Sequence, residues 1–120
     1  MPEKRILLVE DEATTQQLLA NVLRREGYSI DVAPGVAEAM NLVARQPYEL
    51  AIVDWRLPDG DGLLVADRAA DLGAKTLVMS GYLFQMPAGR AMRHETLMKP
   101  LRPSEILAAV ERSIGKAEVG

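Results

Sequence analysis

Residues 50–62 read LAIVDWRLPDGDG, an apolar run that ends at Asp54 and passes into a loop rich in glycine and acidic residues. Four consecutive apolar residues without polar alternation are typical of a strand that is covered on both faces, as in a parallel sheet. Asp54 therefore stands where a buried strand gives way to a loop. A carboxylate at such a position indicates chemistry rather than packing.

Three other apolar runs end in polar residues in the same way. The runs are residues 6–9, 76–79 and 96–98. The polar residues that follow them are Glu10, Asp11, Ser80 and Lys99. Together with Asp54, five polar groups terminate four predicted strands.

Amphipathic stretches alternate with these strands and predict the fold class. Apolar residues recur at helical spacing within residues 18–23, 36–43, 64–72 and 106–114. Gly27, Pro47 and Gly73 are expected to stop the first three helices, and Ser104 to cap the last. With a further strand at residues 29–33, the pattern predicts an α/β fold: a doubly wound, five-stranded parallel sheet of order 2-1-3-4-5.

Such sheets bind ligands beyond the carboxyl ends of their strands, where the first and third strands part. The acids that follow the first and third predicted strands flank that crevice. Residues 81–94 fit the pattern least, because Pro87 and Gly89 are unfavourable within a helix. We expect a loop there, or a fourth helix that is short or missing.

Composition limits the class of protein. The chain has 120 residues, of which 48% are apolar and 26% charged, so we expect one domain over residues 1–120. The absence of cysteine excludes disulfides and thiolate ligands. Apolar runs are too short for a membrane span or signal peptide, which predicts a cytoplasmic protein. A net charge of −3 with dispersed cations argues against nucleic-acid binding, so a protein partner is expected.

The predicted cluster of acids needs a cation. Two carboxylates about 5 Å apart repel by about 3 kcal/mol at an effective dielectric near 20. Lys99 offsets one charge, and oxygen ligands with room for water suit Mg²⁺ better than Zn²⁺. The alternative for Glu10 or Asp11 taken singly is a helix cap. For both together, opposite Asp54, a metal site is favoured.

A carboxylate beside Mg²⁺ can attack a phosphoryl group, because the metal and Lys99 neutralise the transferring oxygens. Asp54 would then become an acyl phosphate, and Ser80 is placed to hydrogen-bond a phosphoryl oxygen. The alternatives are a strand-end hydroxyl bonded to local backbone for Ser80 and a solvated lysine for Lys99. The pair Lys99-Pro100 favours a cis bond that would aim the ammonium inward.

These residues resemble the receiver domain of two-component response regulators. The similarity rests on Glu10-Asp11, Asp54 with the Leu57-Pro58 and Gly62 pattern, Ser80-Gly81 and Lys99-Pro100. The resemblance implies a flavodoxin-like fold in which Asp54 accepts phosphoryl from a histidine kinase or a histidine phosphotransfer protein. It also implies Mg²⁺ bound by Asp11, Asp54 and the backbone carbonyl of Arg56, with Glu10 acting through water. Ser80 and Lys99 would contact the phosphoryl group, and no separate substrate is expected.

The chain departs from the common receiver pattern at three places. Glu10 stands where many receivers have Asp, and Thr96 where many carry an aromatic switch residue. The stretch from Ser80 to Lys99 is about one helical turn shorter than usual. Tyr82 and Phe84 are the candidates to replace the missing aromatic residue.

Other classes of protein fit the residues less well. A phosphatase of the haloacid dehalogenase type needs a second acid where Arg56 stands, and the loop at residues 57–68 lacks calcium ligands at its first and last positions. The serious alternative is a degenerate receiver that binds a partner without being phosphorylated. Arg56 and Tyr82 are expected to overhang the site and tune the lifetime of the acyl phosphate. The equally expected alternative is that both are surface residues without such a role. His94, the only histidine, is expected on the surface.

Overall fold

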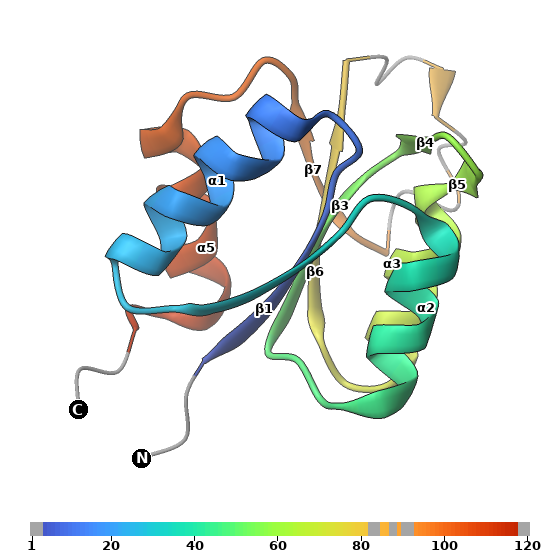
Figure 1. The fold of residues 1–120 in the computed structure, drawn as a ribbon, viewed down its shortest axis with the longest axis horizontal. Helices are drawn as coiled ribbons and strands as arrows, with labels where there is room; N and C mark the ends of the chain where they lie inside the picture. Colours follow the sequence, from blue (N-terminus) through green and yellow to red (C-terminus); the bar gives the residue numbers. More distant parts are fainter. Residues whose placement is uncertain (1–3, 82–84, 87–88, 90–92, 118–120) are drawn as a thin grey trace.

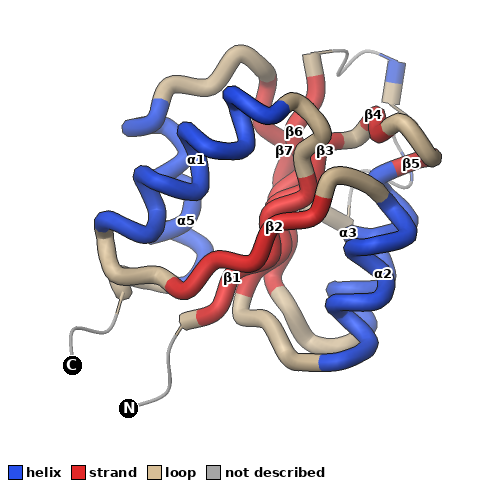
Figure 2. Tube along the Cα trace, in the orientation of Figure 1, coloured by secondary structure: helices blue, strands red, loops and turns tan. Residues whose placement is uncertain are grey.

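A computed structural model describes residues 4–81, 85–86, 89 and 93–117. Five parallel strands form one sheet of order β2-β1-β3-β6-β7, which confirms the predicted α/β fold class and strand order (Figures 1 and 2). The strands of this sheet are β1 (Arg5–Val9), β2 (Ser29–Ala33), β3 (Leu50–Asp54), β6 (Lys75–Ser80) and β7 (Glu95–Met98). The helices are α1 (Ala13–Arg25), α2 (Val36–Arg45), α3 (Gly62–Asp71) and α5 (Pro103–Ile114).

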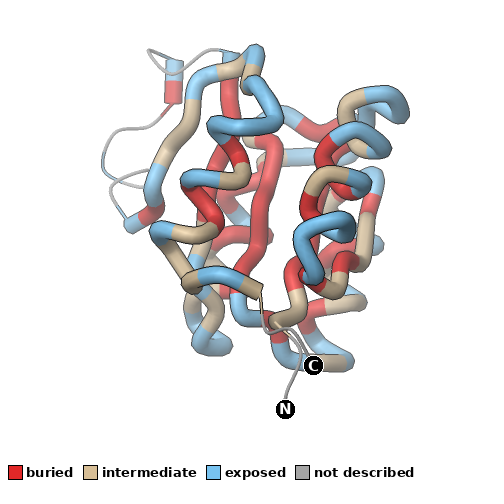
Figure 3. Tube along the Cα trace, turned by 90° about the vertical axis from the view of Figure 1, so that its left-hand side faces the viewer, coloured by how far each residue is buried: buried red, intermediate tan, exposed pale blue. Residues whose placement is uncertain are grey.

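The sheet is covered on both faces, which explains why its central strand is apolar throughout. Every residue of β3 is buried. In β1, Ile6 and Leu8 pack with α1 and α5, whereas Leu7 and Val9 pack with α2 and α3. Successive side chains of a strand point to opposite faces, so one strand supplies both cores. Figure 3 shows the buried residues concentrated along the sheet and on the helix faces turned toward it.

The predicted helix ends at glycine are confirmed, and one predicted helix start is wrong. Gly27 and Gly73 follow α1 and α3 with φ of 104° and 99°, a conformation that glycine adopts without steric cost. Ser104 does not cap α5. The helix begins at Pro103 after Arg102, whose backbone N–H donates to Glu105 Oε1 at 2.9 Å. Proline at the first helical position favours the earlier start.

The glycine-rich loop after β3 is more ordered than a simple turn. Two short antiparallel strands, β4 (Arg56–Leu57) and β5 (Gly60–Asp61), form a hairpin between β3 and α3. The expected short or missing helix between β6 and β7 falls mostly outside the described residues, as do Tyr82 and Phe84. Among the described helices, none is both long and apolar enough to span a bilayer.

Candidate functional site: an acidic cluster bridged by a lysine

The carboxyl ends of four strands bring the predicted polar residues to one edge of the sheet. Parallel pairing aligns Val9 with Val53, Asp54 with Met79, and Ser80 with Met98. The residues at or just after these strand ends therefore meet at the same edge. Glu10, Asp54 and Ser80 are buried there, and Asp11 is exposed.

Lys99 bridges two of the acids. Its Nζ lies 3.0 Å from Glu10 Oε1 and 3.0 Å from Asp54 Oδ2. The peptide bond between Lys99 and Pro100 is cis, as the sequence suggested, and Lys99 N–H donates to the Ser80 carbonyl at 2.9 Å. This hydrogen bond continues the pairing of β6 with β7 and places the backbone of Lys99 beside that of Ser80. The structure thus brings Lys99 to Asp54 and Glu10, as the sequence predicted.

Glu10 is held on both sides of its carboxylate. Its Oε1 accepts from Lys99, its Oε2 accepts from the backbone N–H of Glu12 at 3.1 Å, and its side chain is fully buried. The backbone carbonyl of Glu10 accepts from Gln16 Nε2 at 2.8 Å, which fixes the start of α1 beside the site.

The electrostatics of the cluster show an excess of negative charge. Burial raises the pKa of Glu10, and the charge of Asp54 raises it further, against the lowering effect of the hydrogen bonds from Glu12 and Lys99. Burial works to lower the pKa of Lys99, but the hydrogen bonds to Asp54 and Glu10 outweigh it and raise that pKa. Lys99 therefore stays charged at neutral pH, and one ammonium faces two carboxylates.

The three acids are close enough to share a cation. Glu10, Asp11 and Asp54 each offer a carboxylate oxygen, and these oxygens lie within 4.8 Å of one another. The donor set contains only hard oxygen atoms, and Asp11 is exposed, so the cluster fits a hydrated hard cation such as Mg²⁺. Because both oxygens of Glu10 already accept hydrogen bonds, Asp11 and Asp54 are the acids better placed to ligate an ion directly.

The backbone after Asp54 turns so tightly that one position requires glycine. Gly62 N–H donates to the Trp55 carbonyl at 2.6 Å, and a Cβ at Gly62 would lie 2.0 Å from the Asp54 carbonyl oxygen. A contact that short against backbone cannot be relieved by a side-chain movement. Gly62 thus belongs to the site because it lets α3 begin directly beside Asp54.

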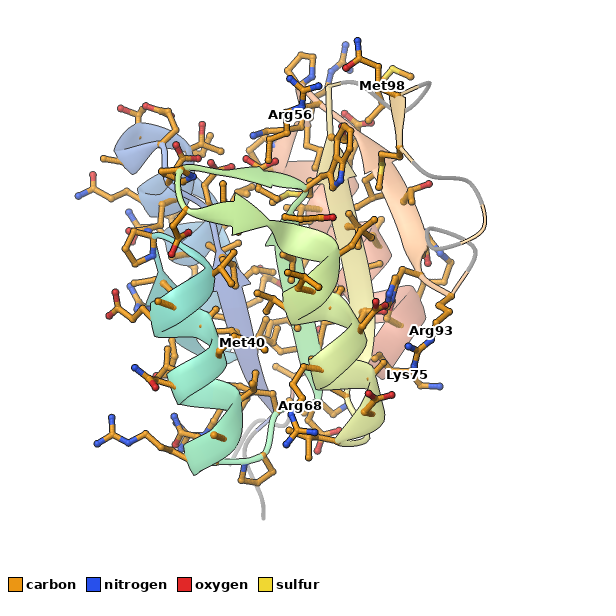
Figure 4. The ribbon with its side chains drawn as sticks, turned by 90° about the vertical axis from the view of Figure 1, so that its right-hand side faces the viewer. Met40, Arg56, Arg68, Lys75, Arg93 and Met98 are labelled. Atoms are coloured by element: carbon orange, nitrogen blue, oxygen red, sulfur yellow. The ribbon has the colours of Figure 1, made fainter. Side chains whose placement is uncertain are left out.

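Arg56 overhangs this end of the molecule. Its guanidinium carbon lies 5.1 Å from the centre of the Trp55 ring, and its Nη2 lies 2.5 Å from Gln85 Oε1. In Figure 4, Arg56 and Met98 lie at the same end of the molecule, which is the end where the strands terminate. The prediction that the Arg56 carbonyl ligates a metal stays a prediction. Thr96, at the expected switch position, is half-buried and pairs with Val78.

His94 is not the surface residue that the sequence suggested. Its side chain is fully buried, with Nδ1 at 2.5 Å from Thr76 Oγ1 and Nε2 at 2.7 Å from Asp67 Oδ1. Asp67 and Thr76 lie 27 and 18 residues away along the chain, so no local pattern could have paired them with His94. The imidazole of His94 can be buried because both of its ring nitrogens have hydrogen-bond partners. These three residues are named the His94 cluster below.

Comparison with known proteins agrees with the geometry. The family model of the response regulator receiver domain matches residues 6–111. The acid tolerance regulatory protein ActR of Rhizobium meliloti is 30% identical over 96% of this chain, and the match covers 62% of that regulator's length. A 14.6 kDa protein of Leptolyngbya boryana is 29% identical over 89% of this chain and 87% of its own. The chain thus spans about three-fifths of the length of the first of these relatives.

Solved structures give the same result. A CheY-like receiver domain from Methanospirillum hungatei superposes with a TM-score of 0.84 at 25% identity, over 94% of each chain. The response regulator TrrA of Thermotoga maritima, solved with Mg²⁺ and BeF, superposes with a TM-score of 0.81 at 30% identity, over 91% of this chain and 97% of TrrA. On the sequence match, the fold and the arrangement of the strand ends, this chain belongs to the response regulator receiver domain family.

Proposed function

We propose that this chain is the phosphoacceptor of a two-component pathway and that Asp54 receives the phosphoryl group. The observation that carries the proposal is the pair of 3.0 Å contacts from Lys99 Nζ to Asp54 and Glu10, with Asp11 beside them. The cluster has more carboxylates than cations, so it favours the binding of a further cation. That cation and Lys99 can then neutralise the negative charge of a phosphoryl group.

The donor is proposed to be a phosphohistidine of a histidine kinase or a histidine phosphotransfer protein. A carboxylate oxygen of Asp54 forms a bond to phosphorus while the phosphorus–nitrogen bond breaks, and the electron pair leaves with the imidazole, which then takes up a proton. The TrrA structures support this choice of partner, because one of them is a complex with the histidine kinase ThkA, at a TM-score of 0.80 and 30% identity to this chain.

Each residue of the cluster has a separate role in this proposal. Lys99 exchanges its contact with Asp54 for one with a phosphoryl oxygen, and the Ser80 hydroxyl donates to another. Asp11, Asp54 and the Arg56 carbonyl would hold Mg²⁺, and Glu10 would act through water. Bound Mg²⁺ would supply positive charge that lowers repulsion between the carboxylates and the phosphoryl oxygens. Phosphorylation then biases pre-existing conformations and changes affinity for a protein partner.

Trp55 adjoins Asp54 and is half-buried, so its fluorescence can report the site. We expect a saturable change on adding Mg²⁺ and a second change on adding beryllofluoride or a small acyl-phosphate donor. Asp54→Asn should abolish the second change and the incorporation of phosphoryl measured by mass spectrometry. A degenerate receiver, which acts by binding alone, would show no incorporation in the unaltered protein.

Arg56 is proposed to tune the lifetime of the acyl phosphate. Its side chain lies over Trp55, the neighbour of Asp54, and reaches Gln85. From there, in this proposal, it limits the approach of water to Asp54. The dephosphorylation rate of Arg56→Ala should therefore differ from that of the unaltered protein. Equal rates would show that Arg56 is a surface residue without this role.

A further inference from the structure

Helix α2 is capped from a distant part of the chain. The residue before the helix, Gly35, has no side chain to bind the free N–H groups of the first turn. Asp59 supplies both missing acceptors: its Oδ1 accepts from Val36 N–H at 2.7 Å and its Oδ2 from Ala37 N–H at 3.0 Å. A carboxylate at this end also meets the positive end of the helix dipole. The cap therefore links α2 to the hairpin that follows the site.

The backbone at Gly35 is shaped for this contact. A Cβ at Gly35 would lie 2.6 Å from Asp59 Oδ1, so a larger residue would displace the carboxylate. The φ of Gly35 is −162°, extended backbone that any residue adopts, and glycine is needed there for space alone. The hydrogen bonds from Ala37 and Val36 lower the pKa of Asp59, which is consistent with a carboxylate that is held ionised.

The same hairpin carries the predicted metal ligand Arg56. Arg56 pairs with Asp61 and Leu57 pairs with Gly60, so Asp59 lies in the turn that joins the two short strands. Asp61 caps α3 through its Oδ1, which accepts from Leu63 N–H at 2.8 Å. Figure 1 shows the hairpin at the same end of the molecule as the first turns of α2 and α3. Asp59 and Asp61 thus attach the hairpin to two helices.

We propose that Asp59 is a positioning residue for the metal site, and that it couples Mg²⁺ occupancy to the order of the first turn of α2. This inference rests on the proposed function, since it concerns the same site. When the cap is present, the hairpin holds Arg56 in place before the ion arrives. When the cap is lost, the ion must order the hairpin on binding, and its affinity falls. Coupling between two sites is reciprocal, so Mg²⁺ should in turn protect the capped N–H groups of α2.

The test measures Mg²⁺ affinity by calorimetry in four variants. Asp59→Ala removes the cap, Gly35→Ala displaces it, and Asp59→Asn keeps an acceptor without the charge. Lys4→Met is the matched control, because Lys4 also binds a helix end, but at the C-terminus of α5. Its Nζ donates to the carbonyls of Ile114 and Lys116 at 2.6 and 2.8 Å. We expect about a tenfold weaker Mg²⁺ affinity in Asp59→Ala and Gly35→Ala, the lower end of the loss seen when a direct partner of a metal ligand is removed, because Asp59 acts on Arg56 through the hairpin.

Asp59→Asn should recover part of that affinity, and Lys4→Met should bind Mg²⁺ as the unaltered protein does. Hydrogen exchange at Val36 and Ala37 should slow on adding Mg²⁺ in the unaltered protein and not in Asp59→Ala. If Asp59→Ala loses stability but keeps full Mg²⁺ affinity, the inference fails and the proposed function stands. If the unaltered protein does not bind Mg²⁺, the proposed function fails and takes the inference with it. Should Asp59→Ala not fold, Asp59→Asn and Gly35→Ala decide the question.

Discussion

Among the residues that the structure describes, the acids at the strand ends and the residues around His94 form groups of buried polar side chains that differ in charge balance. At the carboxyl ends of the strands, Glu10 and Asp54 share one ammonium from Lys99, with Asp11 nearby; Glu10, Asp54 and Lys99 are named the rim cluster below. In the His94 cluster, one imidazole lies between one carboxylate and one hydroxyl, and both ring nitrogens have partners. The rim cluster has more negative than positive groups, whereas in the His94 cluster both nitrogens of the imidazole already have a hydrogen-bond partner.

The difference shows that burial of polar groups is not by itself a mark of function. Among the described residues, no buried side-chain nitrogen or oxygen lacks a hydrogen-bond partner, so both clusters satisfy that requirement. Only the rim cluster gains by binding something further, because additional positive charge would relieve carboxylate repulsion. The two clusters lie in different parts of the molecule. In Figure 4, Arg56 lies at the end where the strands terminate, whereas Arg93, the neighbour of His94, lies well away from that end.

The largest effect on this comparison should come from Lys99→Met. Removing the ammonium leaves Glu10 and Asp54 facing each other without compensation, and breaking a buried ion pair costs about 3 kcal/mol of unfolding free energy. Urea denaturation at neutral pH measures it, with Lys75→Met, an exposed lysine, as control. An unchanged unfolding free energy would mean that the rim cluster does not depend on Lys99.

The pH dependence of the same variant tests the direction of the pKa shift. Since the folded state raises the pKa of Lys99, its contribution is fully present below the ordinary value of 10.5 and is lost as the pH rises through the raised value. As the pH rises from neutral, the stability difference between the unaltered protein and Lys99→Met should therefore stay constant until above about 10.5 and then shrink. A difference that already shrinks between pH 7 and 9 would contradict this.

His94→Ala should destabilise the fold by about 2 kcal/mol, because it leaves a cavity and removes a partner from both Asp67 and Thr76. Mg²⁺ affinity should not change, since the His94 cluster shares no residue with the rim cluster. Thermal unfolding and calorimetry together check both statements. His94→Asn can keep one of the two contacts, so its stability should fall between those of the unaltered protein and His94→Ala. Loss of Mg²⁺ binding in either variant would show that the two clusters are linked.

Glu10→Gln should weaken Mg²⁺ binding about tenfold, equivalent to about 1.4 kcal/mol, because it removes one negative charge from the rim cluster. Its amide oxygen can still accept from Lys99. Burial raises the pKa of Glu10, so the ionised carboxylate costs stability at neutral pH, and that cost disappears as the pH falls through the raised pKa. Because the amide nitrogen of glutamine would face the Glu12 N–H in place of an acceptor, we expect Glu10→Gln to be less stable than the unaltered protein at acidic pH. That deficit should shrink as the pH rises and the cost of the Glu10 charge returns in the unaltered protein, and a deficit that does not change with pH would count against this.

Arg93→Ala should have the smallest effect, below about 0.5 kcal/mol, because exposed ion pairs contribute little. The Arg93 side chain is 49% exposed, its nearer partner Asp71 is 57% exposed, and its contact with the less exposed Asp67 is longer, at 3.5 Å. Urea denaturation is again the measurement. A loss similar to that of His94→Ala would mean that the arginine, rather than the imidazole, holds this part of α3 to β7.

The parts of the molecule that could be predicted from sequence are those that depend on local pattern. Apolar runs identify strands, and in a parallel sheet the residues after each strand meet at one edge whatever the loops between them do. For that reason the positions of the strand ends alone predict that Asp54, Glu10 and Lys99 lie close together. The start of α5 was misplaced by two residues because Ser104 and Pro103 are both favourable near a helix start, and only the backbone decides between them.

The parts that escaped prediction depend on which distant surfaces pack together. Asp59 caps a helix 23 residues before it, and His94 finds Asp67 27 residues before it; neither contact has a repeating pattern or a fixed spacing. Periodicity and strand ends are local properties, so they are enough to place the strands, the two covered faces and the acids at the strand ends, whereas the strand order 2-1-3-4-5 was expected from the common arrangement of such folds. Whether a polar side chain finds partners inside the protein depends on contacts between elements remote in the chain, so only the folded molecule settles it.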